Sequence, residues 1–321
     1  MTTISDDYIA RTNYIPIIDI VTYCDRTDGF KKGVDSSGNT IYDRWIDYYK
    51  MGFRGMVSSS SERTLCGAIL APKTSHIHAV TSIAFKEQQN LIEYAGLTSS
   101  LVLDFYVKTL GISTLAQSIL QSFPLGIHNK YHNELFCRTL MLNCINSYYA
   151  KIWENNYKED YKSLSWSIND NRLKEFNLLS NQWSWSTPLR NHFERRLALV
   201  EIDVIAAIAL GLTLKDLELI YTLQFSIMQQ YDADTWYDKL GNIIFTSNSQ
   251  GLKGVGLDRK QWEQVRNQKE GEIYVHTIDP AKSELYGGQQ VTYYAPYTKC
   301  DRIEDYRRAW AHFEKIFKEE E

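Results

Sequence analysis

The sequence lacks the motifs by which many enzyme families are recognised. It contains no G-x-S-x-G nucleophile elbow, no H-E-x-x-H zinc motif and no convincing carboxylate pattern of a nuclease. Its five cysteines (Cys24, Cys66, Cys137, Cys144 and Cys300) are scattered and form no C-x-x-C pair, which is typical of reduced thiols in a cytosol. These absences argue against the common hydrolase chemistries and against a cysteine-rich zinc site.

Long apolar runs are also missing. No run approaches the ~20 residues that a membrane-spanning helix needs, and the N-terminus, M-T-T-I-S-D-D, has neither the basic start nor the apolar core of a signal peptide. We therefore expect a soluble, cytoplasmic protein with no membrane contact. Because a chain of 321 residues exceeds the size at which one core usually stops growing, two or three subdomains are expected.

An overall basic charge is absent as well. The formal net charge is −4, which argues against a free-standing, nonspecific nucleic-acid binder. The charge is uneven, however: from Lys50 to Lys86 there are five Lys/Arg and one Glu, so this stretch is locally basic. The 22 Tyr and 8 Trp predict either a partner interface or a core rich in aromatic side chains.

The pattern of apolar and turn residues predicts both strands and helices. Two strands, Thr64–Leu70 and His78–Phe85, are expected to be joined through a Pro72–Ser75 turn, after a largely irregular N-terminal part with a turn at Asp35–Asn39. Helices are expected from Gln88 onward and over Leu101–Leu110, Ile112–Ser122, His132–Trp153, Arg190–Gly211, Leu214–Gln224 and Arg302–Phe317. A hairpin is expected over Asp234–Thr246. Residues 154–188 are polar and Trp-rich, and they resemble an exposed loop region or a mobile insert.

These elements predict an α+β fold in three parts. Residues 1–125 would form a small β-rich recognition subdomain with a packing helix, and residues 126–230 a helical subdomain. Residues 231–321 would hold the β-hairpin, a Gly-rich loop and the C-terminal helix.

The locally basic stretch contains the best candidates for a binding site. A strand edge that offers Arg, Lys, His and Ser together suits phosphates and base edges. Arg54 and Arg63 could pair with guanine or phosphate, and Lys73 with phosphate; the other candidates are Ser58, Ser59, Ser60, Ser61, His76 and His78. The alternative is an ordinary exposed β-turn.

Two other patterns have both a functional and a plain interpretation. His76 and His78, expected on one side of a strand, could bind a metal, but no further ligand is obvious nearby, and contacts to DNA or solvent are the alternatives. The sequence Gly251–Leu257 (G-L-K-G-V-G-L) lacks the ending of a P-loop. It fits a loop whose Lys253 lies near a DNA phosphate better than it fits a nucleotide cradle.

The order of several motifs resembles a known family. The pattern F-R-x-M, E-R-T-L-x-x-A-I-L-x-P, Y-A-G-L-x-S-S-L-x-x-D-F-Y-V-K and F-P-L resembles the target-recognition region of Type IIG and related adenine-N6 DNA methyltransferases. Later segments resemble the C-terminal parts of large phage-defence methylases; they include Ile202-Asp203, Gly211-Leu212-Thr213, Thr235–Asp238, Gly254–Leu257 and Cys300–Arg302 with Asp305–Arg307. In that family the counterpart of Arg63–Leu65 begins a strand, and the counterpart of Gly96–Phe105 is a tightly packed helix.

The chain departs from the family in its catalytic motifs. No Gly-rich S-adenosylmethionine motif is present, and Tyr293–Tyr297 (Y-Y-A-P-Y) resembles the N-P-P-Y loop only superficially, without its Asn and first Pro. The resemblance therefore implies the recognition half of a methylase, with no cofactor in this chain and S-adenosylmethionine in a partner or a missing domain.

The leading hypothesis is a module that recognises double-stranded DNA for an adenine-N6 methyltransferase of a restriction or phage-defence system. Its Trp/Tyr-rich helical part would dock the catalytic subunit, and the chain would not be an enzyme on its own. The alternatives are a scaffold protein of the same defence complex that makes no base contacts and a diverged nuclease.

Overall fold

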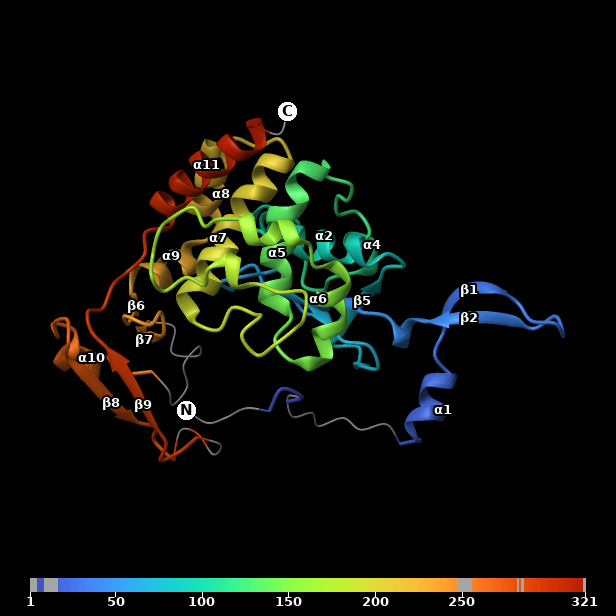
Figure 1. Cartoon of the computed structure of the whole chain (residues 1–321), viewed down its shortest axis with the longest axis horizontal. Helices are drawn as coiled ribbons and strands as arrows, with labels where there is room; N and C mark the ends of the chain where they lie inside the picture. The colour runs from blue at the N-terminus through green and yellow to red at the C-terminus, as the bar shows by residue number, and fades with distance from the viewer. Residues whose placement is uncertain (1–4, 9–16, 248–255, 282, 284–285, 320–321) are drawn as a thin grey trace.

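The computed structural model describes residues 5–8, 17–247, 256–281, 283 and 286–319 of the chain (Figure 1). It confirms an α+β fold, in which helices pack around a small three-stranded sheet and antiparallel hairpins lie at both sides of the body. The boundaries at residues 125 and 230 stay predictions. One large core takes buried residues from Tyr49 to Met228 and from the C-terminal helix.

An N-terminal arm extends from the body (Figure 1). It consists of helix α1 (Ile20–Asp25) and the hairpin of strands β1 (Gly29–Val34) and β2 (Thr40–Arg44). The predicted turn is confirmed, because the Asp35 carboxylate accepts the backbone N–H groups of Ser37 and Asn39 at 2.9 and 2.8 Å. The hairpin itself was not expected, since neither of its faces is buried enough to impose an alternating pattern on the sequence.

The central sheet has the order β4-β3-β5, with all neighbours antiparallel. Strand β3 (Lys50–Arg54) lies between β4 (Gly67–Leu70) and β5 (Val80–Ala84). The two strands expected over residues 64–70 and 78–85 are present, but they do not pair with each other. Both are shorter than predicted, and each pairs with β3, whose short sequence gave no strand signal.

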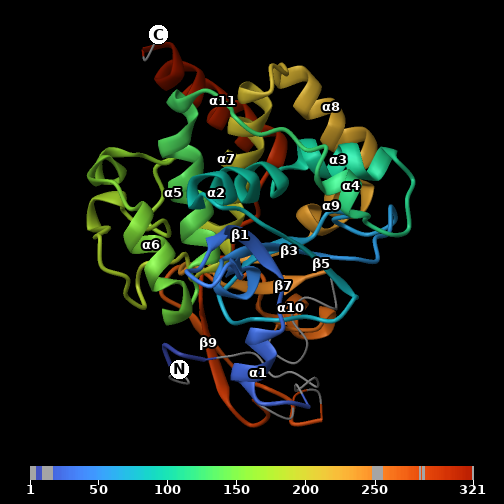
Figure 2. The ribbon, with the colours of Figure 1, turned by 90° about the vertical axis from the view of Figure 1, so that its right-hand side faces the viewer.

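Helix α2 (Gln88–Thr98) covers one face of this sheet, above β3 and β5 in Figure 2. Met51 and Phe53 point toward it from β3, and the Phe53 ring lies edge-on to Tyr94 at 6.0 Å. Gly96 makes close packing possible on the other side of α2. A Cβ atom there would come within 2.7 Å of Thr139 Oγ1 on helix α5.

Helix α7 (His192–Ala209) forms the middle of the helical body and packs against five other helices. Around it lie α2, α3 (Leu101–Thr109), α5 (His132–Asn143), α8 (Leu214–Gln224) and α11 (Arg302–Glu319). The cap predicted at Thr213 is confirmed, because its hydroxyl accepts the Asp216 N–H at 3.2 Å and the Asp216 carboxylate accepts the Thr213 N–H.

Two predicted helices are shorter in the structure. The helix expected over residues 132–153 ends at Asn143, and a separate helix α6 (Ala150–Asn156) follows. Only α4 (Gln117–Leu120) forms within residues 112–122. The remaining helix of the body is α9 (Ser226–Ala233).

Residues 154–188 are irregular, as expected, but they are not simply exposed. Tyr161 and Phe176 are buried in the main core. The indole N–H groups of Trp166 and Trp183 donate to the carbonyl oxygens of Lys174 and Cys144 at 2.7 and 2.8 Å. Tryptophan here supplies hydrogen bonds that fix irregular backbone onto the helices.

The C-terminal part has a second, smaller core. Strands β6 (Thr235–Tyr237) and β7 (Ile243–Thr246) form the predicted hairpin. Helix α10 (Arg259–Val265) places Trp262 parallel to the Phe245 ring at 5.6 Å. An unexpected hairpin of β8 (Ile273–Thr277) and β9 (Gln290–Tyr294) completes the unit, so Tyr293, the first residue of the Y-Y-A-P-Y sequence, is on a strand.

No helix within the described ranges is long and apolar enough to cross a membrane.

Candidate nucleic-acid interface

The two faces of strand β3 carry different side chains. Met51 and Phe53 are buried toward α2, so alternation places Lys50, Gly52 and Arg54 on the opposite face. The connection from β4 to β5, residues 71–79, crosses this opposite face: Lys50 Nζ donates to the Thr74 carbonyl oxygen at 2.7 Å. We call the surface formed by Arg54 and residues 71–79 the crossover face.

The crossover face brings together four of the expected contact residues. Arg54, Lys73, His76 and His78 are all exposed. Arg54 is the Cα partner of Val80, and Gly55 N donates to the Ala79 carbonyl oxygen at 2.8 Å, which places His78 beside the end of β3. No carboxylate of the described ranges forms an ion pair with Arg54.

The two histidines are in the connection and not on a strand. The strand β5 begins only at Val80, so the expected arrangement of His76 and His78 on one side of a strand is wrong. His76 Nε2 is 2.8 Å from Ser82 Oγ, which holds its ring against the face of β5. No group of three or more His, Cys, Asp or Glu within the described part of the chain is placed to hold a metal ion.

Lys73 is already paired. Its ammonium contacts the Asp47 carboxylate, and both side chains are about half exposed. Its backbone adopts φ +63°, and its N–H donates to the Ile46 carbonyl oxygen at 2.7 Å. A phosphate at Lys73 would therefore have to compete with an exposed ion pair, which is a weak interaction in water.

The serine loop leaves β3 next to Arg54. Ser58, Ser59 and Ser60 are exposed, and Ser61 is half-buried. The hydroxyls of Ser58 and Ser60 lie 2.9 Å apart, so one donates to the other. The loop is closed across its base because the Thr64 hydroxyl donates to the Ser58 carbonyl oxygen at 3.1 Å.

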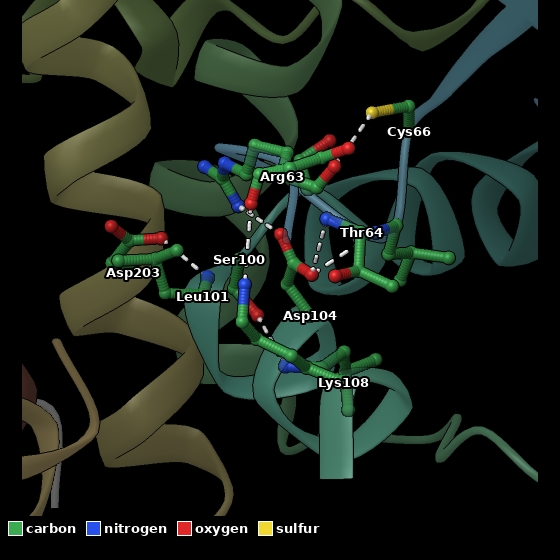
Figure 3. Close-up of polar contacts among 12 residues, drawn as sticks. Arg63, Thr64, Cys66, Ser100, Leu101, Asp104, Lys108 and Asp203 are labelled. Carbon is green, nitrogen blue, oxygen red and sulfur yellow. Dashed lines mark hydrogen bonds and ion pairs between the residues drawn. The ribbon is translucent and has the colours of Figure 1, made fainter. Parts of the chain in front are cut away.

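Arg63 lies apart from these residues and is directed inward (Figure 3). Its side chain is only 18% exposed, and its guanidinium is 3.7 Å from the carboxylate of Asp104 on α3. Asp104 Oδ1 also accepts the backbone N–H groups of Thr64 and Leu65, each at 3.0 Å. Asp104 therefore binds the end of the serine loop through both backbone and charge.

A second buried carboxylate, Asp203 on α7, completes this arrangement. Asp203 accepts the Leu101 N–H at 2.7 Å and the Tyr306 hydroxyl at 2.8 Å, and Arg302 lies 3.6 Å away. Motif residues far apart in the sequence thus meet in one place. We call Arg63, Asp104, Asp203, Arg302 and Tyr306 the buried cluster.

Burial sets the protonation behaviour of the cluster. It raises the pKa of Asp104, while Arg63 and the N–H groups of Leu65 and Thr64 act in the opposite direction. Burial likewise raises the pKa of Asp203, against the effects of Arg63 and Arg302. Arg63 therefore helps to keep both carboxylates ionised.

The sequence did not identify three residues that interact with the serine loop or with Arg63. Asp104 and Asp203 belong to motifs quoted above, but they were not recognised as partners of Arg63 because they are distant from it in sequence. Lys108 was missed too, although its ammonium donates to the Ser61 carbonyl oxygen at 3.2 Å. Lys253, an expected phosphate contact, lies outside the described residues.

Comparisons with known proteins give no match among family models, curated proteins or solved structures. The function is therefore inferred from the residues themselves and from the resemblance of their order to the methylase recognition region.

Proposed function

We propose that this chain recognises double-stranded DNA and directs an adenine-N6 methyltransferase of a restriction or phage-defence system to its target. The observation that carries the proposal is the position of Arg54. It is exposed at the end of β3, without a carboxylate partner in the described ranges, beside His78 and the start of the serine loop. An unpaired guanidinium can donate two parallel hydrogen bonds to guanine or to a phosphate.

The neighbouring groups extend this surface in a way that suits DNA. The serine hydroxyls can donate to or accept from either bases or phosphates, and exposed imidazoles can do the same. Lys50 and Lys73 add positive charge around the crossing connection, balanced there by Asp47. The local positive charge thus belongs to one face and is compatible with a net charge of −4 for the chain.

The reaction itself would belong to a partner. Methylation of adenine in a duplex requires the base to leave the stack and enter a pocket. By its resemblance, this chain corresponds to the region that selects the target, and S-adenosylmethionine would be bound by the catalytic subunit or domain.

Selection from a randomised duplex library tests the proposal. The wild-type chain is expected to enrich a defined sequence, and Arg54→Ala to bind that sequence more weakly because the contact made by the guanidinium is lost. Lys315→Ala is the matched control, because it removes one positive charge from an exposed site on α11. Failure of the wild type to bind any duplex would contradict the proposal, as would equal behaviour of the two variants.

A scaffold role without base contacts is the second candidate, and one observation favours it. The outer sides of α3 and α8, which pack against each other, expose Tyr106, Leu110, Leu219 and Leu223. Exposed apolar residues that gather on neighbouring helices can form a contact surface for another protein. By contrast, Trp153, which lies in the helical part expected to dock a partner, is buried in the main core. In a scaffold, Arg54→Ala would leave the methylated-adenine pattern of the host cell unchanged.

A further inference from the structure

The serine loop is fixed to the helical body at its C-terminal end. Lys108 and Asp104, both on α3, bind three successive parts of it: the Ser61 carbonyl oxygen at 3.2 Å and the Thr64 and Leu65 N–H groups at 3.0 Å each. Helix α3 is in turn fixed to α7, because Asp203 accepts the N–H of Leu101 at its first turn. The loop position is thus coupled to two helices.

Arg63 is the cation that this coupling requires. Asp104 and Asp203 are both completely buried, and Arg63 approaches the first and lowers the pKa of both. Asp203 has a second cation nearby, because Arg302 lies 3.6 Å from its carboxylate. Asp104 forms no ion pair other than that with Arg63 within the described ranges. Without Arg63, the buried Asp104 carboxylate would lose the one ion pair it forms within the described ranges and keep only the smaller electrostatic effect of Lys108, so its hydrogen bonds to the two loop amides would weaken.

We infer that Arg63 is a positioning residue, which contacts no DNA and sets the conformation of the Ser58–Ser61 loop that does. This inference rests on the proposed function. It separates the two arginines of the basic stretch by role: Arg54 binds DNA directly, and Arg63 acts through Asp104. A positioning residue changes specificity and affinity when it is lost, but it leaves the number of phosphates neutralised by the protein unchanged.

The test compares Arg63→Ala, Arg63→Lys and Arg54→Ala in two measurements. The first is amide hydrogen exchange of residues 58–66 in the free protein, relative to β3 and α2. In Arg63→Ala these amides are expected to exchange at least about tenfold faster, the factor that follows from losing one contact to a charged group. Arg63→Lys keeps the charge and should restore most of the protection. Arg54→Ala should exchange like the wild type.

The second measurement is binding to the duplex that the wild type selects from the library and to a scrambled duplex, over a range of salt concentrations. Arg63→Ala is expected to reduce the ratio of the two affinities while keeping the wild-type salt slope. Arg54→Ala should make the slope shallower by about one unit for a lost phosphate contact.

The outcomes separate the inference from the proposed function. A salt slope in Arg63→Ala that is as shallow as in Arg54→Ala would show that Arg63 binds phosphate, and unchanged exchange at residues 58–66 would show that it does not position the loop. Either result overturns the inference. If Arg63→Ala does not fold, Asp104→Asn supplies the variant that lacks the ion pair, and Arg63→Lys remains the variant that keeps the charge. If no protein binds DNA, the proposed function fails, and the exchange data still decide whether Arg63 fixes the loop.

Discussion

Arg138 offers a direct test of how the helical body is held together. Its side chain is completely buried on α5, where it donates to Glu201 at 2.5 Å, to Glu134 and to the Ser165 carbonyl oxygen at 2.9 Å. The rings of Trp166, Phe176 and Phe313 lie 5.1–5.3 Å from its guanidinium. One cation therefore joins α5, α7, α11 and the irregular segment that follows α6.

Arg138→Met keeps most of the side-chain volume but leaves two buried carboxylates without a cation. Removing one partner of a buried ion pair costs about 3–5 kcal/mol, a large part of the ~5–15 kcal/mol by which a domain is usually stable. We expect the free energy of unfolding in urea, followed by circular dichroism, to fall by about this amount. The triple variant Glu134→Leu/Arg138→Met/Glu201→Leu should recover part of the loss, because no uncompensated charge remains.

The recovery is expected to be incomplete for a specific reason. Glu201 Oε1 accepts the Ser167 N–H at 2.6 Å, and this bond is lost together with the bond to Ser165. A loss below about 1 kcal/mol in Arg138→Met would refute the role assigned to the cation, since even a neutral hydrogen bond contributes that much. A triple variant less stable than Arg138→Met would refute the charge argument.

Three further predictions concern single sites. Burial lowers the pKa of Lys174 to about 8 from 10.5, so the folded state binds fewer protons between these values and stability should rise with pH in this window. In Lys174→Met, the free energy of unfolding in urea should not increase between pH 7.5 and pH 9.5. An increase as large as in the wild type would contradict the pKa assigned to Lys174. Gly96→Ala should destabilise the protein by about 1–3 kcal/mol through the contact with Thr139 on α5, and no change in the melting temperature would disprove that close packing. Thr213→Ala should cost about 1 kcal/mol by removing the cap of α8, whereas Thr213→Ser should not.

Local signals in the sequence predicted much of the helical part. Ser100 caps α3 by accepting the Leu103 N–H, Thr213 caps α8, and the amphipathic pattern after Arg302 forms α11. Each of these signals lies within a few residues of the structure that it produces. The hairpin of β6 and β7 was predictable for the same reason, because its turn and both strands are adjacent in the chain.

Strand pairing and the environment of the site depend on distant residues, and the sequence did not reveal them. Strand β3 separates β4 from β5, although the latter two are joined by a short connection. From the sequence, Arg63 and Arg54 are both expected to be exposed basic residues. In the structure, Arg63 is paired with Asp104, which lies some forty positions away in the sequence. Neither the strand order nor the pairing of Arg63 with Asp104 produces a periodic pattern or a change of composition in the sequence.

The salt dependence of DNA binding tests the central claim most directly. The logarithm of the association constant for duplex DNA should fall linearly with the logarithm of salt concentration for the wild type, Arg54→Ala and Lys315→Ala. The account predicts that Lys315→Ala keeps the wild-type slope and that Arg54→Ala has weaker binding with a slope shallower by about one unit. Identical slopes and affinities for all three proteins, or no binding by the wild type, would contradict it.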